Sequence, residues 1–223
     1  MQAIEALALF PLSDVVLLPQ VSVPLYIFEP RYRQMTRDAL DGSRQIGMIA
    51  VRPDAVADMG GDPPIFDVGC LGRIAHAEQR PDGTFQILLL GEHRFRIREE
   101  HPREGERLYR SARVDLLEDS EPTSDDELAR LEATRVHVLD VLTRIVARAR
   151  PDSSSEQLAG FANLEPTRLI NALAQSISFD PIERQQLLEA NSILARFEIM
   201  GDLLRFRLAA TNGAGAPSGS LPN

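Results

Sequence analysis

Short runs rich in apolar and β-branched residues cover most of the first 117 residues. Runs that predict strands cover residues 6–12, 14–19, 23–28, 45–51, 66–79, 84–100 and 108–117. A turn at Arg80–Gly83 joins two of these runs and predicts a hairpin. In its second arm, apolar positions alternate with Arg94, Arg96 and Arg98, which would place the arginines on one face. The pattern therefore predicts a β-rich first half.

One short helix interrupts the predicted strands. Pro30 stands where a first helical position is expected, and Gly42 stands where the helix should end. Between them Tyr32 and Met35 begin an apolar face with helical spacing. The turn-rich residues 52–64 follow and are expected to form a loop.

The second half has apolar positions three to four residues apart, which is typical of helices. Residues 118–127 are an acidic linker that ends in a capping-box pattern, Ser124-x-x-Glu127. Further helix starts are expected at Ser153-x-x-Glu156, at Pro166 and at Asp180-Pro181-x-Glu183, the last helix continuing to about Leu208. We thus predict an α+β chain with a β-rich part (1–117), a helical bundle (118–210) and a flexible tail (211–223).

Composition removes several classes of chemistry. All 24 positive residues among the 223 are arginine, so no Walker loop, Ser–Lys dyad or Schiff-base lysine can form. Residues 1–117 hold 14 arginines against 17 acids, and the remainder holds 10 against 16, which disfavours nucleic acid as a partner. The chain carries a single cysteine and shows neither a signal peptide nor an apolar run of membrane-spanning length. We expect a cytoplasmic protein without membrane association.

Several motifs occur in a familiar order: "LFPLSDVVLLPQVSVPLYIFEPRYRQMTRDAL", "IGMIAV", "FDVGCLGRI", "PDGTFQILLLGEHRFRI" and "LLEANSILARFEIMGDLL". Over residues 7–208 the chain resembles the amino-terminal substrate-recognition domain of Lon ATP-dependent proteases. The resemblance implies a small twisted barrel-like β subdomain with a short helix, similar to the PUA domains that bind RNA, followed by a helical bundle. A full Lon protease continues into ATPase and Ser–Lys peptidase modules, for which this chain has no lysine. The resemblance thus implies a stand-alone recognition domain without catalytic residues, cofactor or metal.

Three functions follow as hypotheses. We favour a non-enzymatic module that binds unfolded or apolar-rich polypeptide segments, or a partner protein such as an ATP-dependent protease. It would use a groove between the β half and the bundle, with strand addition at an open sheet edge as a further contact. The alternative is an RNA-binding module that uses the PUA-like β half, although aromatic residues make up only 5% of the chain. The third hypothesis is a hydrolase with an unrecognised site.

Candidate binding residues each have a structural alternative. Glu29-Pro30-Arg31-Tyr32 is either a polar recognition cluster or a strand-to-helix corner, and the arginine stripe is either a cationic site or a solvated face. Apolar positions of the last helix fit a bundle core or an exposed ridge. Cys70 and the four histidines are typical of structural positions, since no metal-ligand spacing occurs. The candidate peptide-binding residues are Tyr26, Phe28, Glu29, Arg31, Tyr32, Arg94, Phe95 and Arg96.

Overall fold

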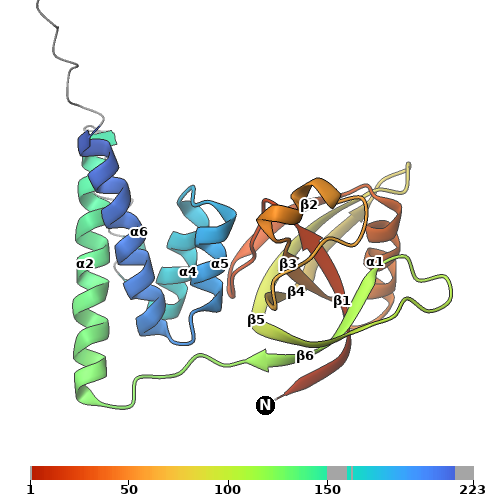
Figure 1. The fold of residues 1–223 in the computed structure, drawn as a ribbon, viewed down its shortest axis with the longest axis horizontal. Helices are drawn as coiled ribbons and strands as arrows, with labels where there is room; N and C mark the ends of the chain where they lie inside the picture. The colour runs from red at the N-terminus through yellow and green to blue at the C-terminus, as the bar shows by residue number, and fades with distance from the viewer. Residues whose placement is uncertain (1, 150–159, 162, 214–223) are drawn as a thin grey trace, which may run out of the picture. The chain divides into compact units, whose positions relative to one another are not determined.

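The computed structural model describes residues 2–149, 160, 161 and 163–213 (Figure 1). The chain divides into two compact units. The first consists of Met1–Asp119 and Asn171–Glu189, and the second of Ser120–Ile170 and Ala190–Asn223. Segment 171–189 therefore groups with the strands, whereas the predicted division is linear along the chain. That division, as a statement about independently folding domains, stays a prediction.

The first unit contains one six-stranded sheet. Its strands are β1 (Ala3–Leu12), β2 (Ser22–Ile27), β3 (Gln45–Ala50), β4 (Val68–Gln79), β5 (Phe85–His101) and β6 (Arg110–Leu117). The strand order is β2-β5-β4-β3-β1-β6, and β5 also pairs with β6. Five strands thus form a closed circuit of pairs, and β2 lies outside it beside the first half of β5. Only β1 and β3 run parallel.

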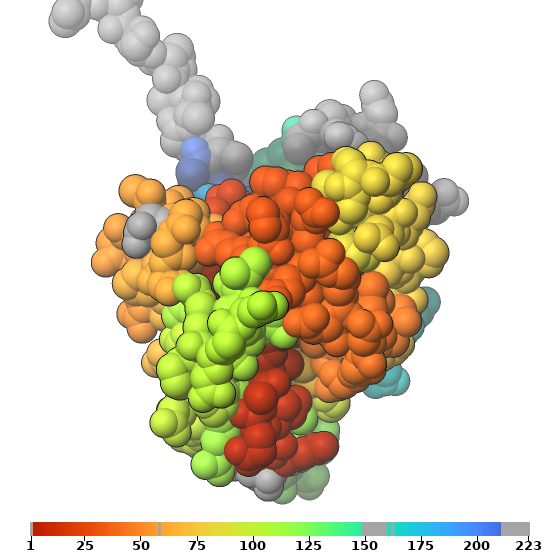
Figure 2. Space-filling view, turned by 90° about the vertical axis from the view of Figure 1, so that its right-hand side faces the viewer, coloured from red at the N-terminus to blue at the C-terminus, as the bar shows by residue number. Residues whose placement is uncertain are grey.

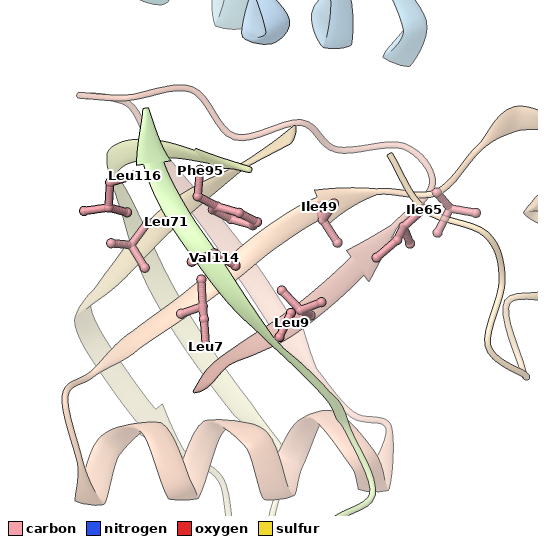
Figure 3. Packing of buried hydrophobic residues seen from close by; sticks show 10 residues of the cluster. Leu7, Leu9, Ile49, Ile65, Leu71, Phe95, Val114 and Leu116 are labelled. Atoms are coloured by element: carbon pink, nitrogen blue, oxygen red, sulfur yellow. The ribbon is translucent and has the colours of Figure 1, made fainter. Parts of the chain in front are cut away.

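The core of this unit is built from the inward-facing positions of the twisted strands (Figure 3). Leu7 and Leu9 of β1 point to the same side because side chains alternate across a strand. Phe95 is completely buried, and its ring packs closely against the backbone of β4 at Gly69. A Cβ added to Gly69 would lie 2.5 Å from the phenyl ring. The other members of the cluster are Ile49, Val51, Ile65, Leu71, Ala112, Val114 and Leu116. The predicted α+β fold with a twisted β subdomain is confirmed, although the six strands do not form a clean barrel because β2 lies outside the circuit.

Helix α1 (Pro30–Asp41) forms as the proline and glycine signals predict. Its inward face includes Tyr32, whose ring centre lies 4.6 Å from that of Phe10 in β1. Gly42 ends the helix and donates its N–H to the carbonyl of Ala39. Within the predicted 52–64 loop, residues 53–58 form a short 3₁₀ helix, η1 (Pro53–Asp58).

Two predicted elements are wrong. Residues 14–19 do not form a strand, although Val16, Leu17 and Leu18 are buried, because an apolar run can fill a core without pairing. The predicted last helix is two helices, α5 (Pro181–Glu189) and α6 (Ile193–Gly213). Ser192 starts the second of these by accepting the N–H of Ala195 on its hydroxyl oxygen at 3.1 Å.

In the second unit α2 (Asp125–Ala149) lies against α6 (Figure 1). The Ser124 hydroxyl accepts the N–H of Glu127 at 3.2 Å, and the Glu127 carboxylate accepts the N–H of Thr123 at 2.7 Å. This arrangement confirms the predicted helix start, with the return bond one residue earlier than in a standard capping box. α4 (Pro166–Ser176) starts at its predicted proline, and the division between the units falls within it. The predicted start at 153–156 lies outside the described residues.

The apolar positions predicted along the last helix divide between core and surface. Among these positions, Phe206 lies at the surface, with 74% of its area exposed. Leu194 and Leu203 are half-buried. The buried members are Leu187, Leu188, Phe197 and Leu204.

Candidate functional site

An exposed aromatic pair lies where β2 ends. Tyr26 is 49% exposed and Phe28 is 60% exposed. Their ring centres are 6.0 Å apart with an angle of 29° between the planes, so the rings stack. Even-numbered residues of β2 face outward and odd-numbered ones inward, which explains why Tyr26 lies at the surface while Ile27 is buried.

The neighbouring strands extend this surface in two cross-strand rows. Tyr26 is opposite Gln86 of β5, which is opposite Glu78 of β4. In the next row Leu88, 37% exposed, lies between Pro24 and His76. The rows border a shallow hollow of about 400 Å³.

Arg80 completes the surface from the β4–β5 turn. Its guanidinium carbon lies 5.5 Å from the centre of the Tyr26 ring, within cation–π range. We call Tyr26, Phe28, Leu88 and Arg80 the outer patch. Figure 2 shows how the region of α1 (orange) lies between the β4–β5 turn (yellow) and the segment before β6 (green).

The Glu29–Tyr32 cluster has a structural task. The Arg31 Nε donates to the Glu29 carboxylate at 2.9 Å, and the same guanidinium donates to the carbonyls of Met59 at 2.6 Å and Gly61 at 3.0 Å. Tyr32 is 4% exposed, and burial raises its pKa to about 12 against the opposing effect of the Arg31 charge. These residues hold the turn after η1 against the start of α1, in agreement with the structural alternative.

The predicted arginine stripe is broken by the fold. Arg94 is 2% exposed, donates to the carbonyl of Leu188 at 3.0 Å and pairs with Asp119 at 2.6 Å. Phe95 is completely buried, so it has no surface for a ligand. Arg96 is exposed, and Arg98 pairs with Asp115 of β6 at 2.6 Å. Because α5 covers β5 at Arg94, alternation along the strand alone could not predict this burial.

Of the eight candidate residues, three are exposed and have no structural role in the contacts described above: Tyr26, Phe28 and Arg96. We remove Tyr32, Arg94 and Phe95 from the candidate surface because they are buried. Sequence analysis missed Leu88 and Arg80. The hairpin turn could have indicated Arg80 as exposed, but Leu88 meets Tyr26 only through the β2–β5 pairing, which no local signal sets.

Cys70 is fully buried in β4, as expected for a small apolar side chain. No group of three or more His, Cys, Asp or Glu side chains that could hold a metal occurs in the part of the chain that the structure describes. No described helix is long and apolar enough to cross a membrane.

The fold is that of the amino-terminal domains of Lon proteases. A crystal structure of a Lon N-terminal domain protein from Xanthomonas campestris superimposes with a TM-score of 0.60 at 23% identity, covering 91% of this chain and 99% of that one. The N-terminal domain of a Mycobacterium avium complex Lon protease gives 0.67 at 18% identity, covering 90% and 98%. Both likenesses concern the fold alone.

The sequence comparison identifies the family. The chain belongs to the family described as the ATP-dependent protease La (LON) substrate-binding domain, whose sequence model matches residues 6–205. The Lon protease of Dictyoglomus thermophilum is 27% identical over 195 residues, and Lon protease 2 of Syntrophobacter fumaroxidans is 28% identical over 196. Each alignment covers 87% of this chain but only 23% of the relative. The chain thus spans about a quarter of the length of these proteins.

Proposed function

We propose that this chain is a non-catalytic polypeptide-binding module that holds apolar segments of other proteins on the outer patch. The observation that carries the proposal is the stacked, exposed pair Tyr26 and Phe28 on a sheet with Leu88 beside it. Contiguous exposed apolar surface commonly marks an interaction site, and aromatic side chains dominate binding energy there. The description of the matched family as a substrate-binding domain supports the proposal.

Side chains, more than backbone pairing, supply the affinity at this surface. The Gly91 N–H donates to the Val21 carbonyl at 2.8 Å, so the residues of β2 bonded to β5 are the odd-numbered ones. The backbone groups of β2 that point away from β5, at the open edge of the sheet, then belong to Ser22, Pro24 and Tyr26. Pro24 has no N–H to offer there. An added strand would therefore gain few hydrogen bonds. Recognition by apolar contact tolerates many sequences, and we expect dissociation constants of about 1–100 μM.

The test measures binding of a dye-labelled, permanently unfolded apolar polypeptide by fluorescence polarisation. A double variant, Tyr26→Ser with Phe28→Ser, should raise the Kd by at least about tenfold, because aromatic anchors cost about 2 kcal/mol or more when truncated. Leu108→Ser is the matched control, since Leu108 is a 49% exposed apolar residue in the segment before β6, which the region of α1 separates from the β4–β5 turn (Figure 2). Equal binding by the double variant and the control would overturn the proposal.

The same protein preparation tests two alternatives, namely RNA binding and binding of an ATP-dependent protease. A dye-labelled single-stranded RNA titrated at low salt tests the RNA hypothesis, because phosphate contacts are strongest there. Tighter binding to RNA than to polypeptide would favour that function. An ATP-dependent protease remains an alternative partner, and a pull-down with the outer-patch variant as control would identify it. A cytoplasmic location stays a prediction.

A further inference from the structure

A second hollow lies in the first unit, formed by residues that the outer patch does not use. It has a volume of about 290 Å³ and is bordered by the end of β3, by η1 and by the start of α5. An engineered apolar cavity of about 150 Å³ accommodates benzene, whereas drug-sized pockets start at about 300 Å³. The hollow therefore has the size for one large side chain. We call it the α5 pocket.

Apolar side chains form its walls. Val56 of η1 is 41% exposed and Ile182 of α5 is 46% exposed, and both border the α5 pocket. Val51 and the half-buried Phe66 contribute further apolar surface. Exposed aliphatic groups around a concavity gain most when an apolar group from another molecule fills it.

The rim of the α5 pocket is acidic. Asp14 and Asp180 both border it and are exposed, and neither carboxylate forms an ion pair with any residue that the structure describes. Two arginines are close in sequence to residues of the pocket. Arg52 is occupied: its guanidinium lies 5.4 Å from the Phe66 ring and 3.8 Å from the Asp67 carboxylate, and its Nε donates to a backbone carbonyl. Arg184 donates to the Ile177 carbonyl at 3.3 Å. The charge at this rim is therefore complementary to a cation.

We propose that the α5 pocket binds one large apolar side chain, preferably aromatic, of a client polypeptide at a position adjacent to lysine or arginine. The apolar ring fills the hollow, and the neighbouring cation approaches the carboxylates of Asp14 and Asp180. The inference rests on the proposed function in one respect, namely that the occupant is a polypeptide. It adds a preference for a neighbouring cation, which Arg80 disfavours at the outer patch.

The experiment uses the ¹⁵N-labelled full chain and four blocked dipeptides as probes: Phe-Arg, Phe-Glu, Ser-Arg and Ser-Glu. Amide chemical shifts are followed during titration, so that binding is located on the chain. We expect Phe-Arg to shift residues of the α5 pocket and to bind about fivefold more tightly than Phe-Glu, the gain available from an exposed ion pair. Neither serine dipeptide should shift these residues at the same concentration.

Three variants complete the test. Asp14→Asn with Asp180→Asn should remove the preference for Phe-Arg over Phe-Glu and leave ring binding in place, because asparagine also serves well before a helix. Ile182→Ser should weaken both phenylalanine probes, whereas Leu108→Ser should change neither. Equal binding of Phe-Arg and Phe-Glu to the unaltered chain, or shifts located elsewhere, would overturn the proposal.

The outcome is separable from that of the proposed function. If the dipeptides bind as expected while no polypeptide binds, the α5 pocket stands and the polypeptide-binding function fails. If a polypeptide binds through the outer patch while Phe-Arg leaves the α5 pocket unshifted, the function stands and the inference fails.

Discussion

Replacing Arg94 by methionine should destabilise the protein by about 3 kcal/mol. The guanidinium is 2% exposed and donates to the Leu188 carbonyl at 3.0 Å, a bond to a charged group worth about 1.5–3 kcal/mol. Its contact with the Glu118 carbonyl, at 3.4 Å, is too long to add much. Losing one partner of a buried ion pair costs about 3–5 kcal/mol, and this figure is reduced here because Asp119 remains 26% exposed and can be hydrated. Methionine fills a similar volume, so the cavity term is small.

The assay is urea unfolding followed by circular dichroism, with Arg96→Met as the matched control. Arg96 lies two residues along the same strand and is exposed, so its substitution should cost less than about 0.5 kcal/mol. In a thermal scan, Arg94→Met should lower Tm by about 6–12 °C, at about 2–4 °C per kcal/mol for a chain of this length. If both variants unfold at the same urea concentration, the assignment of Arg94 as a structural residue is refuted.

Two further predictions concern a close approach and the titration of tyrosines. Gly91→Ala should lower the free energy of unfolding, measured in urea, by about 1–3 kcal/mol, because the new Cβ would lie 2.2 Å from the Leu18 carbonyl oxygen. Gly60→Ala is the control and should be nearly neutral, since a Cβ there would meet no atom within 4 Å. Equal effects of the two substitutions would contradict the packing argument. Burial raises the pKa of Tyr32 to about 12, and burial with an Asp38 hydrogen bond does the same for the pKa of Tyr109. Both tyrosines therefore stay protonated in the folded protein above pH 10.0, which is the ordinary pKa of a tyrosine. The stabilisation that they contribute to the folded state is complete below pH 10.0 and is lost as the pH rises toward 12. Phenolate absorbance of the native protein checks this, and ionisation of both residues near pH 10 would contradict it.

Local signals in the sequence predict the elements well wherever a single residue type sets the backbone. Pro30 and Gly42 bound α1, and Pro166 starts α4, because proline and glycine act on their own position. The strand predicted at residues 14–19 is wrong because a buried loop and a buried strand have the same apolar composition. The break between α5 and α6 falls at Ser192, one of several serines in the chain, and contacts such as its hydrogen bond with Ala195 are not visible in the sequence.

The candidate site is only partly predictable from the sequence, for a reason that lies in tertiary pairing. Tyr26 and Phe28 are two positions apart at the end of one strand, so strand alternation by itself places them on a shared face. The exposure of Leu88 beside them requires the β2–β5 register, which joins residues about sixty positions apart. Burial of Arg94 likewise requires α5, which lies almost a hundred positions further along the chain. Period-two alternation tells which residues share a face, but not which element later covers that face.

The same contacts explain why segment 171–189 belongs to the β-rich unit. Asn171 donates to the Pro19 carbonyl at 3.0 Å and Gln185 to the Val68 carbonyl at 2.9 Å, both through buried side-chain amides. Together with the Arg94 bond to Leu188, these contacts satisfy polar groups that would be costly to bury alone. A strand unit that ended at Asp119 would leave these groups unpaired. The β-rich unit is therefore completed by a segment that follows the long helix α2 in the sequence, and this segment also supplies Asp180 to the rim of the α5 pocket.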